Sequence, residues 1–305
     1  MWTREDTRHG GRYNPQKRGR LSHHPLIAFV SDLRLVANMW LRSGDTSDAN
    51  NLLSFLSDTF SNLEGKNVSL VRMDSGFCSD EIMSYLEAKN NTSYIIAGRF
   101  YQPIQAIAAS KDMHWLAVDK GIEISEQRYQ AGTWKAPRRL IIIRQKIAER
   151  PQAPGRQLRM FAEDDEVNGY RYGAYFTNLN LSAVEVWRLY RGRADAENRI
   201  KELKGDFGFD SFNMRSFNGT EASLTFAMLA YNLMAFFRQF ILQGKTQQTL
   251  STLRYRVFAI GAYFEKNKSG QTILRLALNL KRRAWFEGLW NTGTNTSPPY
   301  KKSIG

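Results

Sequence analysis

Residues 190–204 constrain this chain more strongly than any other segment. Four polar side chains in it stand at relative offsets of 0, 3, 7 and 14: Tyr190, Arg193, Glu197 and Lys204. Because an α-helix turns about 100° per residue, these offsets place the four side chains in one stripe about 60° wide. A neighbouring stripe is apolar and consists of Leu189, Ala196, Ile200, Leu203 and Phe207. The segment therefore predicts a helix with a carboxylate, two cations and a phenol bordering a buried face, where the carboxylate can ligate a metal ion and its neighbours can bind phosphate.

A simpler interpretation of the same segment is a solvent-exposed helix with charged i,i+4 pairs. The far side of the helical wheel, however, already offers a solvated face, formed by Arg191, Asp195, Arg199 and Glu202. Gly192 weakens such a helix by about 1 kcal/mol relative to alanine. A kink at Gly192 would limit the wheel to the residues from Arg193 onward.

The composition favours a polyanionic partner. The chain has 305 residues, enough for one large domain or two modest ones. Lysine and arginine total 43 and aspartate and glutamate total 29, which gives a formal net charge of +14. Nucleic acid is the most common partner of so basic a protein, and a charge that merely prevents aggregation is the alternative. The sequence has no aromatic RNP strand motif to indicate an RNA-binding module.

Cys78 is the single cysteine, which excludes an internal disulfide and a cysteine zinc site and is typical of a reducing cytoplasm. We expect it to pack as a small apolar residue. The N-terminus lacks the apolar core of a signal peptide. Residues 224–242 are the most apolar stretch, but Asn232, Arg238 and Gln239 interrupt it, so a buried core helix is expected there rather than a membrane span.

The first part of the chain has the pattern of an α/β domain. Residues 26–41 alternate in a strand-like way around Ser31-Asp32 and predict a hairpin. Ser47-Asp48 and Ser79 are candidate N-caps of two helices. The remaining elements expected here are a helix over 52–60, a strand over 67–73, a helix over 82–86 and a strand over 94–97. The order β-β-α-β-α-β implies a mixed sheet with helices on its faces.

Residues 103–180 differ in character and predict a β-rich insertion, with strands at 114–118, 139–143 and 170–176. A capping box at Ser182-Ala183-Val184-Glu185 opens the following helical region. Two further helices are expected, an apolar one over 220–242 and a basic one over 271–290. Residues 1–24 are expected to form a basic loop and residues 291–305 a flexible tail.

The spacing Tyr-x2-Arg-x3-Glu-x6-Lys within residues 190–204 resembles the signature of DDE-class transposases of bacterial cut-and-paste insertion sequences. The resemblance continues at residues 11–20 and 22–26, at Asp74-Ser75-Gly76-Phe77, at Ala230-Tyr231-Asn232-Leu233 and at residues 250–254. It implies an RNase H-like α/β fold, a mixed sheet with flanking helices interrupted by the β-rich insertion and followed by a helical C-terminal region. The implied divisions are a basic segment (1–24), a first part of the catalytic domain (25–103), the insertion (104–180), the completion of that domain (181–243), a helical region (244–290) and the tail (291–305).

The resemblance also implies a catalytic site. Asp74 matches the second acid of the family's triad and Glu197 the third, so both are expected to bind Mg²⁺, for which Mn²⁺ can substitute. Tyr190, Arg193 and Lys204 match the positions that contact phosphates near the cleaved end. Judged by local sequence alone, a turn aspartate before Gly76 is the better interpretation of Asp74.

Further residues are weaker candidates for contacts with DNA. Arg99 follows a predicted strand and could bind phosphate, with a surface cation as the alternative. Some members of the family flip a base and stack it on an aromatic residue of the insertion, and Trp134 is the candidate for that role. Trp115 and Trp187 are expected in the core. The adjacent histidines His23-His24 point in different directions and are not expected to form a metal site.

The resemblance departs from the family pattern at the N-terminal end. The triad's first acid is expected on a strand upstream of Tyr13, and neither Asp6, in a segment without apolar alternation, nor Asp32 and Asp45, in turns, fits that position. The chain thus resembles the C-terminal two thirds of a transposase. Loss of the first strand would leave an exposed sheet edge.

The resemblance implies a transposase that hydrolyses a phosphodiester at each transposon end and joins the freed 3′ hydroxyl to target DNA. Double-stranded DNA is the expected partner, with no membrane association, and a homodimer is expected for the full-length protein. The expected location is the bacterial cytoplasm, at the nucleoid. Two alternatives stay open: a non-catalytic DNA-binding fragment that can inhibit full-length transposase, and an unrelated basic interaction protein.

Overall fold

The computed structural model of the chain describes residues 12–14, 17–23, 25–42, 51–147, 166–167, 169–212, 214, 216–242 and 248–295. Contacts divide the chain into two compact units. The sheet unit comprises Gly10–Ala28 and Ala37–Asn198, and the helical unit comprises Met1–His9, Phe29–Val36 and Arg199–Gly305.

The sheet unit contains a seven-stranded sheet in the order β5-β6-β11-β9-β8-β7, with β10 beside β11. Its strands are β5 (Leu70–Met73), β6 (Ser93–Gly98), β7 (Leu116–Asp119), β8 (Ile122–Tyr129), β9 (Arg138–Lys146), β10 (Glu166–Val167) and β11 (Tyr170–Thr177). β5 and β6 pair in parallel and the other neighbours are antiparallel, so the predicted mixed sheet is confirmed. The strands beyond β6 extend the same sheet, and β8 is a strand that the sequence patterns did not predict.

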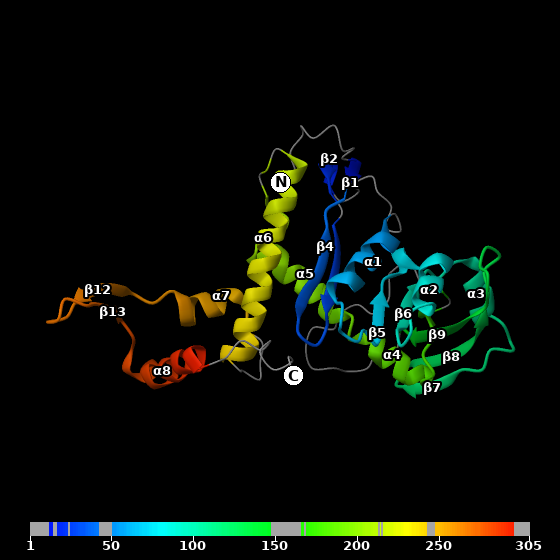
Figure 1. Cartoon of the computed structure of the whole chain (residues 1–305). Helices are drawn as coiled ribbons and strands as arrows, with labels where there is room; N and C mark the ends of the chain where they lie inside the picture. Colours follow the sequence, from blue (N-terminus) through cyan, green and yellow to red (C-terminus); the bar gives the residue numbers. More distant parts are fainter. Residues whose placement is uncertain are drawn as a thin grey trace. The chain divides into compact units, whose positions relative to one another are not determined.

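Helices cover both faces of this sheet (Figure 1). α1 (Leu52–Asn62), α2 (Asp80–Glu87) and α3 (Gln102–Ala108) contribute buried residues to one core cluster, whereas α4 (Ala183–Arg191) contributes to the other. β9 shows the division, because Leu140 and Ile142 belong to the first cluster and Ile141 and Ile143 to the second. A strand buried on both faces is apolar at successive positions, as β9 is.

Two hairpins precede the sheet in the chain. β1 (Arg12–Asn14) pairs with β2 (Lys17–Ser22), so the predicted loop over residues 1–24 is wrong there, because these polar strands lack the apolar alternation on which the prediction depended. β3 (Leu26–Val30) and β4 (Leu35–Trp40) form the predicted hairpin, but as a separate two-stranded sheet. α1 begins after Asn51, whose backbone is left-handed (φ 63°). The N-cap predicted at Ser47-Asp48 lies outside the described residues.

The helical unit follows the first turns of α5 (Ala194–Asp206). Its elements are α6 (Phe217–Phe236), the π-helix η4 (Phe237–Leu242), α7 (Leu250–Leu253), the π-helix η5 (Arg254–Phe258), β12 (Ala262–Lys266), β13 (Thr272–Leu276) and α8 (Leu280–Asn295). The predicted helix over 271–290 is wrong in its first part. β13 pairs there with β12 across a turn in which Gly270 has a φ of 78°, and α8 continues into the predicted tail as far as Asn295.

α6 differs from the expected buried core helix. Only one stripe of it is buried, formed by Thr220, Leu224, Ala227, Tyr231 and Ala235. Phe226 is 71% exposed and Leu233 is 60% exposed, because the helix is apolar all round while neighbours within the described residues cover one side. Residues Phe217–Leu242 are long and apolar enough to cross a membrane by length and composition alone, which is weak evidence for a single helix.

Two charged residues that were expected on a solvated face are buried in the helical unit. Arg199 is 5% exposed and donates a hydrogen bond to the carbonyl oxygen of Ser31 at 2.9 Å. Glu202 pairs with Arg238 at 2.6 Å, and both side chains are nearly buried. The helical wheel could not predict this burial, because the covering elements come from distant parts of the sequence.

Candidate active site

Asp74 stands where β5 ends, at the carboxyl end of the parallel pair β5-β6. It is the N-cap of a short 3₁₀ helix, Ser75–Phe77, and its Oδ1 accepts a hydrogen bond from the Ser75 N–H at 2.8 Å. Local sequence predicted a turn aspartate before Gly76, and Asp74 does stand at a turn, where it caps this short helix. The cap occupies only one carboxylate oxygen, and the second remains for other contacts.

The helix is interrupted between α4 and α5. The predicted stripe on one continuous helix from Tyr190 is therefore wrong. α4 is capped by Gly192, and the N–H groups of Arg193 and Ala196 each bond three residues back, to Tyr190 and Arg193, at 2.8 Å. The expected kink at Gly192 is thus confirmed. Glu197 accordingly lies on a different helix from Tyr190.

Gly192 allows strand β5 to approach this break. Arg72 donates a hydrogen bond from Nη1 to the carbonyl oxygen of Leu189 at 2.8 Å. A Cβ atom at position 192 would overlap Arg72 Nη1. Arg72 was not predicted as a site residue, although it is the one charged residue in the apolar strand Leu70–Met73, which is the signal that could have indicated it.

Arg193 brings the two predicted acids together. Its Nη2 lies 2.7 Å from Asp74 Oδ2, and its Nη1 lies 3.4 Å from Glu197 Oε1. The side chains of Asp74 and Glu197 are about half exposed (50% and 46%), and that of Arg193 is 25% exposed. A single guanidinium therefore spans two carboxylates that remain accessible to solvent.

Tyr190 forms the apolar wall of this site. Its hydroxyl donates to the carbonyl oxygen of Met73 at 3.3 Å, and its ring lies 4.5 Å from that of Tyr175 between centroids. Burial raises the pKa of Tyr190 to about 12, against an opposing effect of Arg193, and burial also raises the pKa of Tyr175. Both phenols are neutral at physiological pH, so Tyr190 is a hydrogen-bond donor there and not a base.

The donor set suits a divalent cation that keeps part of its water shell. Asp74 and Glu197 offer hard carboxylate oxygens, which Mg²⁺ prefers, and their exposure leaves room for water ligands. One cation, the Arg193 guanidinium, already contacts both groups. Among the residues that the structure describes, no cluster of three His, Cys, Asp or Glu side chains could hold a metal ion.

The remaining predicted DNA-contacting residues have surroundings of their own. Lys204 is exposed on the part of α5 that belongs to the helical unit. Arg99 follows β6 and donates to the hydroxyl of Tyr101 at 3.0 Å. Trp134 packs edge-on against Phe176, with ring centroids 4.8 Å apart, and Arg138 lies over its ring.

The other tryptophans and the histidine pair have separate surroundings. Trp187 is 3% exposed in the second core cluster, as expected. Trp115 is only half-buried and lines a cavity, so its expected core position is wrong in part. His23 Nδ1 lies 3.3 Å from the carbonyl oxygen of Arg42, and His24 is outside the described residues.

Comparison with known proteins decides the family. The profile described as "Transposase DDE domain group 1" matches residues 9–292, nearly the whole chain. The chain belongs to the DDE transposase family. The predicted family is therefore confirmed, and the mixed sheet with flanking helices is consistent with the RNase H-like fold. Members of the DDE family generally use divalent metal ions, which agrees with the hard oxygen donors of Asp74 and Glu197.

One solved structure similar to this DDE transposase chain is a piggyBac transposase, described as a synaptic complex with hairpin DNA. The two share 12% sequence identity with a TM-score of 0.45, over 96% of this chain and 55% of the other. The chain thus spans about half the length of that protein. Among curated proteins, no significant match is found.

Proposed function

We propose that this chain carries the catalytic centre of a DNA transposase that cleaves phosphodiesters at transposon ends and joins the freed ends to target DNA. The observation that carries the proposal is the Arg193 guanidinium, which spans Asp74 and Glu197 across the strand-end site. Family membership supports the reaction class, and the exposed pair Asp74 and Glu197 is where we place the cleavage reaction.

In this proposal Asp74 and Glu197 ligate Mg²⁺ or Mn²⁺. An ion held there would supply activation of water or of a 3′ hydroxyl and stabilisation of the leaving oxygen. Arg193, released from the carboxylates, turns to a phosphate of the DNA, where a bidentate guanidinium is well suited. Tyr190 stays protonated and donates a hydrogen bond to phosphate in place of its bond to the Met73 carbonyl oxygen, and Lys204 adds a further phosphate contact. The family's triad has a third acid, and none of the aspartates Asp6, Asp32 and Asp45 fits its position.

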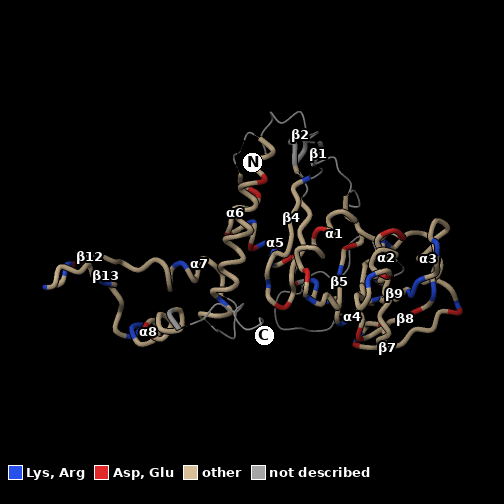
Figure 2. Tube along the Cα trace, in the orientation of Figure 1, with Lys and Arg blue, Asp and Glu red and all other residues tan. Residues whose placement is uncertain are grey.

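The charge of the chain supports DNA as the partner. The formal net charge is +14, and Figure 2 shows Lys and Arg along elements of both units instead of a single basic segment. Neutralising several phosphates releases counterions, so the affinity for duplex DNA is expected to fall steeply with salt. We further propose that the protein forms a homodimer and is located at the bacterial nucleoid.

The proposal is tested on a duplex made from the DNA that flanks the coding sequence, including its inverted repeats. With Mg²⁺ or Mn²⁺, the unaltered chain is expected to cleave it, and Glu197→Gln and Asp74→Asn are expected to abolish cleavage while duplex binding persists. Asp195→Asn is the matched control, because Asp195 is an exposed acid on the same turn of α5. Cleavage that survives Glu197→Gln would refute the assignment.

A non-catalytic DNA-binding role is the second candidate. It is favoured by the presence of two, not three, acidic ligands at the site within the described residues. In the same assay it predicts salt-sensitive duplex binding without cleavage at any metal concentration, and inhibition when the chain is mixed with full-length transposase.

A further inference from the structure

The last part of the helical unit carries positive charge that the proposed reaction does not use. Residues 250–295 contain eight Lys and Arg against two Glu, so they contribute six of the chain's 14 net positive charges. Figure 2 shows Lys and Arg next to α7 and on α8. Five of these cations belong to η5 and to the first turn of α8: Arg254, Arg256, Lys281, Arg282 and Arg283.

Two contacts between arginine and an aromatic ring join η5 to α8. The Cζ atom of Arg256 lies 5.2 Å from the ring centroid of Trp285, and that of Arg282 lies 5.6 Å from the centroid of Tyr255. Tyr255 is 72% exposed and Trp285 is 39% exposed, so the rings hold the guanidinium groups where solvent reaches them. We call these four residues the η5-α8 surface. Because the rings already position both guanidinium groups, binding of an anion costs less side-chain entropy.

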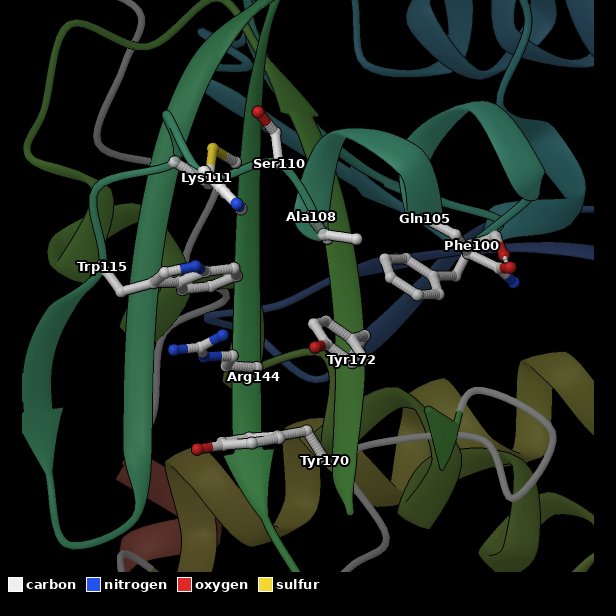
Figure 3. Close-up of a pocket in the computed structure, with 11 residues that line it drawn as sticks. Phe100, Gln105, Ala108, Ser110, Lys111, Trp115, Arg144, Tyr170 and Tyr172 are labelled. Carbon is white, nitrogen blue, oxygen red and sulfur yellow. Dashed lines mark hydrogen bonds between the residues drawn. The ribbon is translucent and has the colours of Figure 1, made fainter. Parts of the chain in front are cut away.

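The positive charge of the η5-α8 surface has no acidic counterpart. Among the residues that the structure describes, no carboxylate pairs with Arg256 or Arg282. Arg144 in the sheet unit provides the contrast. Its Cζ lies 4.0 Å from the ring centroid of Trp115 and 4.6 Å from that of Tyr170, and Figure 3 shows it between the two rings. Glu123, however, accepts a hydrogen bond from Arg144 Nε at 2.6 Å, so the charge of Arg144 is compensated within the protein.

The cations of α8 do not stabilise the helix that carries them. Lys281, Arg282 and Arg283 stand in its first turn, where the helix dipole favours acidic side chains, and that turn contains no acid. Successive cations also repel one another. A polyanion bound at this surface would offset both repulsions, so the arrangement favours an anionic partner over a purely structural role.

The backbone of duplex DNA has the charge that this surface lacks. A duplex carries one negative charge per about 1.7 Å of its axis, so neighbouring cations can contact several phosphates at once. A guanidinium is planar and weakly hydrated and bonds phosphate oxygens in pairs. The rings of Tyr255 and Trp285 already contact the guanidinium groups, so the surface offers charge to the backbone and no direct reading of base sequence.

We propose that the η5-α8 surface binds the phosphate backbone of duplex DNA irrespective of its sequence. This surface belongs to the helical unit, whereas Asp74 and Glu197 belong to the sheet unit. The chain therefore has a surface that anchors duplex DNA and is distinct from its carboxylate site. The proposal rests on the proposed function only in taking DNA as the partner.

The test measures duplex binding without divalent ions, so that cleavage plays no part, and repeats it over a range of KCl concentrations. The probe is a fluorescently labelled blunt duplex of mixed sequence. The double variant Arg256→Gln/Arg282→Gln is expected to weaken binding more than about tenfold at ~0.1 M salt and to reduce the slope of log affinity against log salt by about 1.8, since each phosphate contact contributes about 0.9. Arg256→Lys/Arg282→Lys keeps both charges and is expected to retain most of that slope, which distinguishes loss of charge from a packing defect.

The matched control is Lys120→Gln/Arg128→Gln, which removes the same charge from exposed positions of the sheet unit and is expected to leave the slope unchanged. Equal reductions of the slope in the two glutamine variants would show that only total charge matters. An unchanged slope in Arg256→Gln/Arg282→Gln would show that the surface does not contact DNA. A change of oligomeric state in sedimentation of that variant without DNA would assign the surface to contacts between copies of the chain. Each of these three results would overturn the proposal.

The outcome is independent of the cleavage assay. Glu197→Gln is expected to keep the duplex affinity and the salt slope of the unaltered chain. Absence of cleavage together with a slope that depends on Arg256 and Arg282 would overturn the proposed reaction alone. Cleavage together with a slope that does not depend on them would overturn this inference alone.

Discussion

Arg193 Nη2 lies 2.7 Å from Asp74 Oδ2, although 119 positions separate the two residues in the chain. The same guanidinium also approaches Glu197 at 3.4 Å. The two carboxylates would repel each other at close range, and one cation offsets that repulsion. In the proposed function, a divalent ion held by both acids would offset the same repulsion, and Arg193 would then be available to a phosphate.

Replacement of Arg193 therefore distinguishes a phosphate contact made by Arg193 from metal binding by the two acids. We expect Arg193→Ala to reduce cleavage by about 10²–10³-fold, the usual cost of losing a donor that stabilises transition-state charge. The Mg²⁺ concentration for half-maximal activity is expected to stay constant or fall, because a competing cation is removed. The free energy of unfolding is expected to change by less than about 1 kcal/mol, since the pair is partly exposed.

The Mg²⁺ dependence of cleavage distinguishes Arg193 from the metal-binding acids. Asp74→Glu is expected to leave residual cleavage and to raise the required Mg²⁺ concentration, because it keeps the carboxylate but displaces the ligand oxygens. If Arg193→Ala raises the required Mg²⁺ concentration by the same factor, Arg193 acts by positioning the acids. The proposal that Arg193 contacts a DNA phosphate would then be wrong.

The contact between Gly192 and Arg72 predicts a coupled pair of substitutions. Gly192→Ala places a Cβ atom against Arg72 Nη1 and should break the hydrogen bond to Leu189. The backbone at Gly192 is ordinary right-handed helix (φ −62°), so alanine itself introduces no strain there. We expect reduced cleavage with a stability change within about 1 kcal/mol, because better helix propensity offsets the lost contact.

A double-mutant cycle measures this coupling. In an Arg72→Ala background, Gly192→Ala is expected to have no additional effect on cleavage or on the free energy of unfolding. Additive effects of the two substitutions would contradict the steric explanation.

Arg138 joins β9 to α2 and gives the protein a predictable response to acid. Its side chain is 4% exposed and bonds to Asp80, Ser84 and Glu87. We expect Arg138→Met to reduce the free energy of unfolding at pH 7 by about 3 kcal/mol, at the lower end of the usual range because Glu87 is partly exposed. Arg275→Met removes an exposed pair with Glu265 and should cost less than about 1 kcal/mol.

The hydrogen bond from Arg138 holds the pKa of Asp80 below its ordinary value of 3.8. A carboxylate whose pKa is lower in the folded state stabilises the fold above its unfolded pKa and loses that contribution as pH falls through the folded pKa. Urea unfolding of the unaltered chain should therefore show a loss of stability below about pH 4 that Arg138→Met reduces. An unchanged acid slope in the variant would show that other carboxylates cause it.

Asn232 on α6 should stabilise the helical unit through the backbone of β4. Its side-chain amide accepts from the Val36 N–H at 2.8 Å and donates to the Val36 carbonyl oxygen at 2.9 Å. Asn232→Leu leaves both backbone groups without that partner and is expected to cost about 1–3 kcal/mol in thermal or urea unfolding. Leu233→Asn, at an exposed neighbouring position, is the control and should be nearly neutral.

Local sequence signals predicted the local features of the site correctly. Ser79 caps α2 and Ser182 forms a capping box with Glu185, as their spacing indicates. The turn at Asp74 and a possible kink at Gly192 could also be predicted, because turns and kinks depend on interactions within a few residues. The hairpin β12-β13 was missed, since a short exposed hairpin lacks the apolar periodicity that distinguishes strand from helix.

The sequence by itself determined the family, the order of the strands and helices over residues 26–97, and the identity of Asp74 and Glu197 as candidate acids. Only the tertiary structure decided that one arginine spans them, that Arg72 fits against Gly192, and that Arg144 lies between two aromatic rings. The reason is physical. Periodicity and capping record interactions between residues close in the chain, whereas each of these contacts depends on how β5, β9 and the α4-α5 break are brought together by packing on both faces of one sheet.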